Sequence, residues 1–236
     1  MADDGSSDDA GDQWVSWYLS CKGNEILCEV DHEYITDRFN LTGLFQAVPD
    51  YQLTMDLILD QLDDDDLNEA KRSQLDKAAC HLYGLIHARF ILTGRGQHKM
   101  MEKFKAGVFG QCPRALCDAQ AMLPVGLTNQ PFMGPVYMYC PRCEDIYHSR
   151  SNRHSVIDGA YFGTTFPHLF LLCYPNAVPV KTSMRYEPTV FGFRINDVVK
   201  AQRQPPKELV EKTESQRRSK QQQVQRQLMD TSDSES

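Results

Sequence analysis

The clearest helix in the sequence lies between residues 75 and 90, where hydrophobic side chains recur every three or four positions. The recurring positions are Leu75, Ala78, Ala79, Leu82, Ile86 and Phe90, and this spacing places them on one face of an α-helix. Gly94 is predicted to end the helix, because glycine readily adopts the left-handed conformation found after helix C-termini. A shorter helix is expected next, with Met100, Met101 and Phe104 facing inward.

Three shorter helices are predicted nearer the N-terminus. Trp14, Trp17 and Tyr18 recur at helical spacing. Asp31 and Asp50 each precede a periodic hydrophobic stretch, so both are predicted to cap a helix N-terminus. The expected members of these two helices are Tyr34, Ile35 and Arg38 after Asp31, and Tyr51, Thr54, Met55, Ile58, Leu59 and Leu62 after Asp50.

The pattern changes at Gly107, after which glycine, proline, tyrosine and short alternating runs dominate. Residues 135–139 and 189–195 are predicted as strands, and Phe166–Cys173 as a short buried helix. Four segments follow from this pattern: an acidic disordered tail over 1–13, an all-helical domain with an acidic loop over 14–106, a second domain over 107–200, and a polar, largely disordered tail over 201–236.

Composition narrows the class of protein. Hydrophobic residues make up 41% of the 236 residues, enough for a buried core, and the formal net charge is −7. No apolar run reaches the roughly 18 residues that a membrane helix needs. Residues 1–12 carry five aspartates and no base, which argues against a secretory signal or a transit peptide. The expected location is therefore the cytoplasm and nucleus.

Four of the eight cysteines form two close pairs. Cys112 and Cys117 are separated by four residues, Cys140 and Cys143 by two, and twenty-two residues lie between the pairs. Such spacing lets two tight turns direct four thiolates at one zinc ion. Four thiolates leave no open coordination position, so the site is predicted to be structural. The predicted fold class is therefore α+β, with the helical domain followed by a four-cysteine zinc ribbon.

Other interpretations of the cysteines are weaker. One alternative is that the four cysteines are buried separately and bind no common ion. In that case the two Cys-Pro-Arg sequences, each with a suitable gap to a second cysteine, would have arisen by chance. A redox pair at Cys140 and Cys143 usually follows a strand in a thioredoxin-like unit, and that pattern is absent. An iron–sulfur cluster is less favoured than zinc. The remaining cysteines are interpreted as packing residues or free thiols: Cys21, Cys28, Cys80 and Cys173.

No set of catalytic motifs occurs in the sequence. Gly94-Arg95-Gly96 lacks the third glycine of a kinase glycine-rich loop, and Asp158-Gly159-Ala160 is not a metal-binding Asp-Phe-Gly motif. There is no P-loop and no nucleophile elbow. The histidines near the cysteine pairs, His148, His154 and His168, are interpreted as surface or hydrogen-bonded core residues. The chain is therefore predicted not to be an enzyme.

Several specific motifs resemble the regulatory (beta) subunits of casein kinase II. They are Gly23-Asn24-Glu25 with Cys28-Glu29-Val30, Phe39-Asn40-Leu41-Thr42-Gly43-Leu44, Leu82 to Arg89, and Asp158 to Gly163. The resemblance runs from about Trp14 to Ile195. In one departure, the run of histidines usual in the family before Asp158 is reduced to His154.

This resemblance implies a regulatory and scaffolding role. It implies a homodimer formed through the zinc domain, with Pro113, Leu127 and Ile146 as candidate interface residues. It also implies a tetramer of two such chains with two catalytic alpha subunits, which the chain would stabilise while modulating the selection of protein substrates. The candidate contacts with the catalytic subunit are Leu169, Phe191 and Phe193. For each set, ordinary core packing is the competing interpretation, and Phe191 and Phe193 are expected to share one face of a strand.

Two acidic segments carry further expectations. The stretch with Asp60, Asp63, Asp64, Asp65 and Asp66 resembles the acidic regulatory loop of the family, which would bind polyamines or lysine-rich proteins; a solvated loop is the alternative. In the tail, Ser6 has Asp9 three residues later and is the favoured phosphorylation site. Ser7 is a weaker site, and Ser232 near the C-terminus is a competing site to Ser6.

A nucleic-acid-binding zinc ribbon is the rival class of protein. Arg114, Arg142, Arg150 and Arg153 would support it, whereas the negative net charge argues against it. A steep dependence of DNA affinity on salt would distinguish the two classes. A third class, the metalloenzymes, is excluded by a closed shell of four thiolates.

Overall fold

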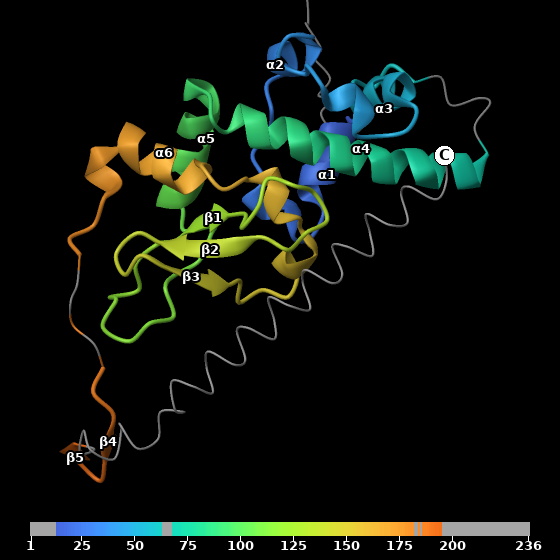
Figure 1. Cartoon of the computed structure of the whole chain (residues 1–236). Helices are drawn as coiled ribbons and strands as arrows, with labels where there is room; N and C mark the ends of the chain where they lie inside the picture. The colour runs from blue at the N-terminus through green and yellow to red at the C-terminus, as the bar shows by residue number, and fades with distance from the viewer. Residues whose placement is uncertain (1–12, 63–67, 182–183, 185, 195–236) are drawn as a thin grey trace, which may run out of the picture. The chain divides into compact units, whose positions relative to one another are not determined.

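The computed structural model describes residues 13–62, 68–181, 184 and 186–194 (Figure 1). The chain divides into two compact units between Met184 and Arg185. The first unit mixes helices and an antiparallel sheet, as predicted, and contains the four paired cysteines. Among the described residues, no helix is long and apolar enough to cross a membrane.

Helix α4 (Glu69–Phe90) is the central element of the first unit. The Asn68 side chain accepts a hydrogen bond from the Lys71 backbone N–H at 2.8 Å and so caps its N-terminus. All six residues of the predicted hydrophobic stripe are buried. In Figure 1, α2 and α3 lie on one side of α4 and the sheet lies on the other. The stripe therefore identified the helix around which the unit is built.

Three shorter helices precede α4, as predicted: α1 (Trp14–Ser20), α2 (His32–Thr36) and α3 (Tyr51–Ile58). Asp31 and Asp50 are the N-cap residues of α2 and α3 as predicted, but neither side chain accepts a hydrogen bond from its helix. Asp31 instead pairs with Lys99 at 2.7 Å and Arg95 at 3.2 Å, and Asp50 pairs with Lys71. These carboxylates join elements that are distant in sequence, and tertiary pairing displaces local capping.

The predicted role of Gly94 is also wrong. Helix α4 ends at Phe90, and Gly94 is the first residue of α5 (Gly94–Lys105). The Thr93 hydroxyl accepts from the Gly96 backbone N–H at 3.2 Å, so Thr93 caps a new helix at this point. Met100 and Met101 are buried as expected.

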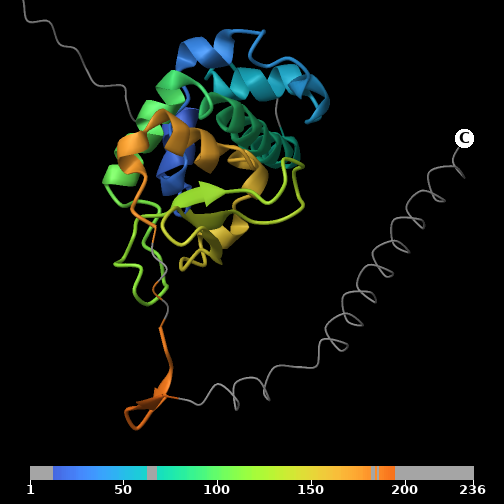
Figure 2. The ribbon, with the colours of Figure 1, turned by 60° about the vertical axis from the view of Figure 1, so that its left-hand side comes forward.

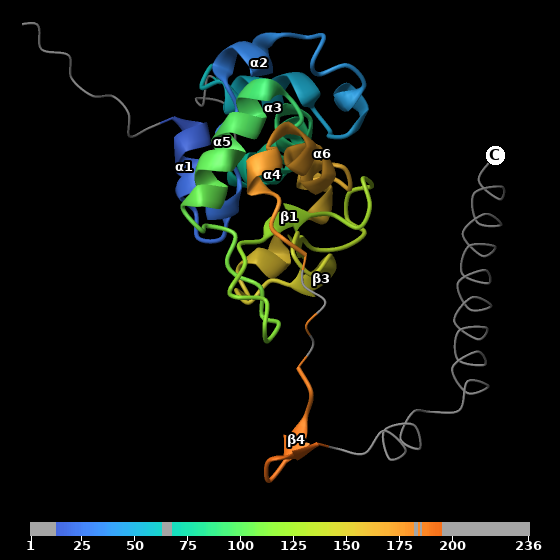
Figure 3. The same ribbon diagram turned by 90° about the vertical axis from the view of Figure 1, so that its left-hand side faces the viewer.

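The sheet contains three antiparallel strands in the order β1 (Leu123–Val125), β2 (Tyr137–Cys140) and β3 (Asp145–His148). Helix α6 (Phe166–Cys173) lies beside α5, and the rings of Phe104 and Phe170 are 5.4 Å apart (Figures 2 and 3). Only one face of α6 is buried, through Phe166 and Phe170. Leu172 and Cys173 are exposed, which corrects the prediction of a fully buried helix. The short 3-10 helices of this unit are Asn24–Ile26, Leu44–Gln46, His154–Val156, η5 (Gly159–Tyr161) and Pro175–Ala177.

Two of the motifs that carried the family resemblance contact each other. A Cβ atom on Gly84 of α4 would lie only 2.4 Å from the Tyr161 ring of η5. The next turn of α4 brings His87 within hydrogen-bond distance of the Tyr161 carbonyl oxygen, at 2.8 Å. A glycine at position 84 therefore allows the chain after the cysteines to lie against the central helix.

One hydrophobic core runs through the first unit. It includes α4 residues such as Leu82 and Ile86 together with Cys112, Cys117 and Cys140. The change in the sequence near residue 106, from helical periodicity to short alternating runs, coincides with the end of α5 at Lys105. The first compact unit, however, extends to Met184. The helices and the cysteine turns thus stabilise a common interior.

The described part of the second unit is a β-hairpin, β4 (Thr189–Val190) paired with β5 (Phe193–Arg194). The single strand predicted over 189–195 is therefore wrong. Phe191 and Gly192 both have positive φ, 50° and 84°, the backbone of a two-residue hairpin turn that favours glycine. Phe191 lies in the turn and Phe193 on the returning strand, so they do not share the face of one strand.

Candidate metal centre

Two tight turns bring the four cysteines together. The first turn carries Cys112 and Cys117 and is closed by the bridge between Gln111 and Ala121. The second is the connection between β2 and β3, in which Cys140 is the last residue of β2. The Glu144 backbone N–H donates to the Cys140 carbonyl oxygen at 2.9 Å. The predicted pairs are therefore two turns, one before β1 and the other between β2 and β3.

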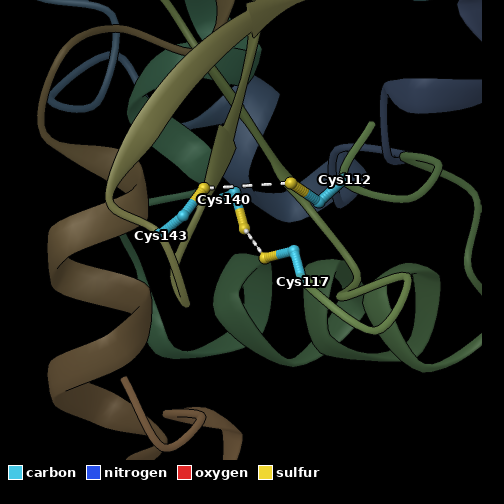
Figure 4. Close-up of side chains that lie close together, drawn as sticks. All are labelled: Cys112, Cys117, Cys140 and Cys143. Atoms are coloured by element: carbon cyan, nitrogen blue, oxygen red, sulfur yellow. Dashed lines mark hydrogen bonds between the residues drawn. The ribbon is translucent and has the colours of Figure 1, made fainter. Parts of the chain in front are cut away.

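The geometry of the thiols fits a tetrahedral metal site. All four Sγ atoms lie within 4.8 Å of one another, and Figure 4 shows them directed toward a common point. Cys112 Sγ lies 3.8 Å from Cys143 Sγ, and Cys117 Sγ lies 3.6 Å from Cys140 Sγ. A Zn–S distance of about 2.3 Å in a tetrahedron places sulfur atoms about 3.8 Å apart. The donor set and its spacing thus suit a zinc ion, with no position left for water.

The surroundings of Cys143 favour a thiolate. The Tyr147 hydroxyl lies 3.2 Å from Cys143 Sγ. Burial opposes ionisation, but hydrogen bonds from Tyr147, from the Asp145 backbone, from Cys140 and from Arg114 together lower the pKa of Cys143 to about 7. Burial raises the pKa of Cys117 to about 11, so a bound cation would be needed to deprotonate it at neutral pH.

Two arginines of the proposed nucleic-acid set are engaged at this centre. Arg114 pairs with Asp145 at 2.6 Å, and Arg142 pairs with Asp118 at 2.6 Å. These guanidinium groups are therefore partly neutralised. Arg150 and Arg153 are exposed. Sequence reasoning missed Asp118, Asp145 and Tyr147, although each aspartate closely follows the second cysteine of a turn.

The other candidate residues near the cysteines have simpler environments. His154 is buried between Ser149 Oγ at 2.7 Å and Glu25 Oε1 at 3.2 Å, and so is a hydrogen-bonded core histidine as interpreted. His148 and His168 are exposed. The remaining thiols, Cys21, Cys28, Cys80 and Cys173, are free in the described structure, and Cys28 is buried.

The predicted dimer residues all lie at the surface of the first unit. Pro113 is exposed in the first cysteine turn, and Leu127 and Ile146 retain 59% and 46% of their accessible surface. These three residues are therefore not part of the hydrophobic core of a single chain. Whether a second copy covers them remains a prediction.

The predicted contacts with a catalytic subunit are divided between the two units. Leu169 is half-buried on α6, whereas Phe191 and Phe193 belong to the hairpin. Phe191 is 96% exposed and Phe193 is 78% exposed. These rings are not core residues of the described chain.

The acidic segment is described only at its first predicted residue. Asp60 has a positive φ of 56°, and its carboxylate accepts from the Trp14 backbone N–H at 2.8 Å. Asp60 therefore stabilises the start of α1 and is not a freely available charge. Asp63, Asp64, Asp65 and Asp66 lie outside the described residues, as do Ser6, Ser7 and Ser232.

Comparisons with known proteins decide the family. Residues 13–194 match the family model described as "Casein kinase II regulatory subunit". The chain belongs to the casein kinase II regulatory subunits. "Casein kinase II subunit beta" of Schizosaccharomyces pombe is 53% identical over 191 residues, covering 81% of this chain and 82% of the relative. "Casein kinase II subunit beta'" of Saccharomyces cerevisiae is 45% identical over 221 residues, covering 91% and 86%.

The family assignment also shows whether the chain is an enzyme. This family is non-catalytic, which confirms the prediction made from the missing motifs. The matched region contains both cysteine turns and the hairpin. The cysteine cluster therefore lies within the region that identifies the family.

Proposed function

We propose that this chain binds one structural zinc ion per copy, dimerises through its zinc-bearing part, and joins two catalytic alpha subunits of casein kinase II in a tetramer. The observation that carries the proposal is the cluster of four Sγ atoms within 4.8 Å, in a chain whose relatives are regulatory subunits. Zinc binding to such a site contributes roughly 10–16 kcal/mol of apparent free energy. That contribution would stabilise the two turns and the surface that they carry.

The dimer surface that we propose contains Pro113, Leu127 and Ile146. All three are exposed apolar residues close in sequence to the cysteine turns or to the strands that follow them. Burying exposed apolar side chains against a second copy is favourable at about 25 cal/mol per Å². The predicted interface would thus depend on the metal, because the turns that present it depend on the metal.

We propose that the hairpin contacts the catalytic subunit, and that Leu169 of α6 is a further contact residue in the first unit. Exposed aromatic rings are the residues that most often dominate protein interfaces, and Phe191 and Phe193 expose most of their surface. Bound there, the chain would stabilise the kinase and modulate its selection of protein substrates.

Three further assignments belong to this proposal. Asp63 to Asp66 would bind polyamines or lysine-rich proteins, Ser6 and more weakly Ser7 would be phosphorylated, and the complex would act in the cytoplasm and nucleus. Nucleic-acid binding is disfavoured as an alternative, since Arg114 and Arg142 are held in ion pairs.

Replacing Phe191 and Phe193 together by alanine tests the proposed kinase contact. Calorimetry against a casein kinase II catalytic subunit should show binding weakened by at least about 2 kcal/mol, the scale of interface hot spots. The dimer should persist, because the hairpin is remote in sequence from the cysteine turns. Phe39→Ala, which removes an exposed aromatic ring of the first unit outside the proposed contact, is the control and should bind normally. Unchanged affinity of the double variant would place the contact elsewhere.

A further inference from the structure

The two cysteine turns are joined by a reciprocal pair of ion bridges. Each turn begins Cys-Pro-Arg, and each arginine reaches an aspartate that follows the second cysteine of the other turn. Arg114 Nη1 lies 2.6 Å from Asp145 Oδ2, and Arg142 Nη1 lies 2.6 Å from Asp118 Oδ2. Because the bridges run in both directions, neither turn can move away from the other without breaking at least one of them.

The bridges attach at or beside residues whose backbone has a left-handed conformation. Asp118 has a φ of 47°, and Glu144, which precedes Asp145, has a φ of 57°. Left-handed conformations of residues other than glycine are unfavourable and persist where the surrounding structure holds them. An ion pair at each of these segments supplies such a constraint beside the metal-ligating cysteines.

The arginines also suit the charge of the centre. Zinc with four thiolates would have a net charge of −2, and the two guanidinium groups, partly neutralised by their aspartates, offset part of it. The side chains of Arg114 and Arg142 are only 28% and 24% exposed. In the described structure, Arg142 Nε is buried and has no hydrogen-bond acceptor, a cost that a surface residue would not incur.

The magnitudes separate a positioning role from a role in overall stability. Partly exposed ion pairs contribute little to the free energy of folding, so their loss would leave the fold intact. Residues that orient metal ligands, in contrast, change metal affinity by about 10–100-fold when replaced. The effect of these arginines should therefore appear in the retention of the metal.

We propose that Arg114 and Arg142 are positioning residues of the metal centre, which lock the two cysteine turns around the ion and slow its release. This inference rests on the zinc site of the proposed function. It explains why the Cys-Pro-Arg sequence occurs twice, since each copy supplies one half of the reciprocal bridge. It also assigns two of the four candidate nucleic-acid arginines to a different task.

The test measures zinc release from the purified full chain to an excess of a chromophoric chelator. Arg142→Ala and Asp118→Asn should each speed release by about tenfold or more, while wild type and both variants start with one zinc per chain. Arg142→Lys keeps the charge but not the planar fork of donors and should give an intermediate rate. Arg38→Ala, an exposed arginine in the helical part, removes the same charge and should release zinc at the wild-type rate.

The exchanged variant Arg114→Asp with Asp145→Arg, at two positions without left-handed backbone, decides the case if a single variant fails to retain zinc. Slow release restored by the exchange would support the bridge, and continued fast release would overturn it. Equal release rates for wild type and Arg142→Ala would also overturn the positioning role while leaving the zinc site in place. A wild-type chain purified without zinc would instead overturn the proposed metal site itself.

Discussion

His87 is the residue whose environment has the clearest consequence for pH. It is fully buried on α4. The Cys28 backbone N–H donates to its Nε2 at 3.1 Å, so Nδ1 carries the proton and donates to the Tyr161 carbonyl oxygen at 2.8 Å. Burial lowers the pKa of His87 to about 4. The folded chain therefore holds a neutral imidazole with a fixed tautomer.

The sign of the pH effect follows from this lowered pKa. An unfolded histidine binds a proton below about pH 6.5, whereas folded His87 does so only near pH 4. Stability is thus fully present above pH 6.5 and is lost as the pH falls toward 4, by about 3 kcal/mol in total. Urea unfolding should show that His87→Gln loses about 2 kcal/mol less than wild type between pH 6.5 and 5. Parallel pH profiles for the two proteins would contradict this account of His87.

At the scale of elements, the contact between α4 and η5 depends on the absence of a side chain at position 84. Gly84→Ala would place a methyl group about where the Tyr161 ring lies, since an added Cβ meets that ring at 2.4 Å. The ring is held by a contact between its hydroxyl and His81 at 3.2 Å, so it cannot move freely. Overpacking of this kind costs about 1–3 kcal/mol.

Thermal unfolding of Gly84→Ala should accordingly show a lowered Tm. Gly94→Ala is the matched control, because an added Cβ there meets nothing within 4 Å and alanine favours a helix more than glycine does. Its Tm should equal or exceed that of wild type. A Gly84→Ala variant as stable as the control would mean that η5 can move away from α4 at little cost.

The elements that the sequence predicted correctly are those with a strong local pattern. The six-residue stripe of α4 and the spacing of the cysteine turns both follow from residues close together in the chain. The hairpin was missed although Gly192 marks its turn, because the alternation around it also suits one strand. Thr93 was the signal for the start of α5, and it was outweighed by the glycine that follows it.

The contacts that the sequence did not predict join residues far apart in the chain. The carboxylate of Asp60 is bonded to the backbone of Trp14, and Asp31 is paired with Lys99. The bridges between Arg114 and Asp145 and between Arg142 and Asp118 likewise join the two turns. The sequence shows which side chains are charged. Only the fold determines which oppositely charged side chain lies close enough to pair with each of them.

At the scale of the whole molecule, the metal should determine both the local fold and the dimer. Three of the four candidate ligands belong to the same buried core as α4. Cys112→Ser should therefore lose zinc, destabilise the part of the chain after residue 107, and abolish dimers. The exposed Cys173 provides a matched control, and Cys173→Ser should keep one zinc and remain dimeric. Zinc analysis combined with sedimentation would contradict the account if Cys112→Ser stayed dimeric without zinc.

The most direct test of the central claim is the mass of the intact assembly by native mass spectrometry. The purified chain alone should appear as a dimer carrying two zinc ions. With a casein kinase II catalytic subunit added, the dominant species should contain two copies of each chain and the same two ions. A chain that stays monomeric, carries no metal and leaves the catalytic subunit free would contradict the proposal of a zinc-stabilised dimeric regulatory subunit.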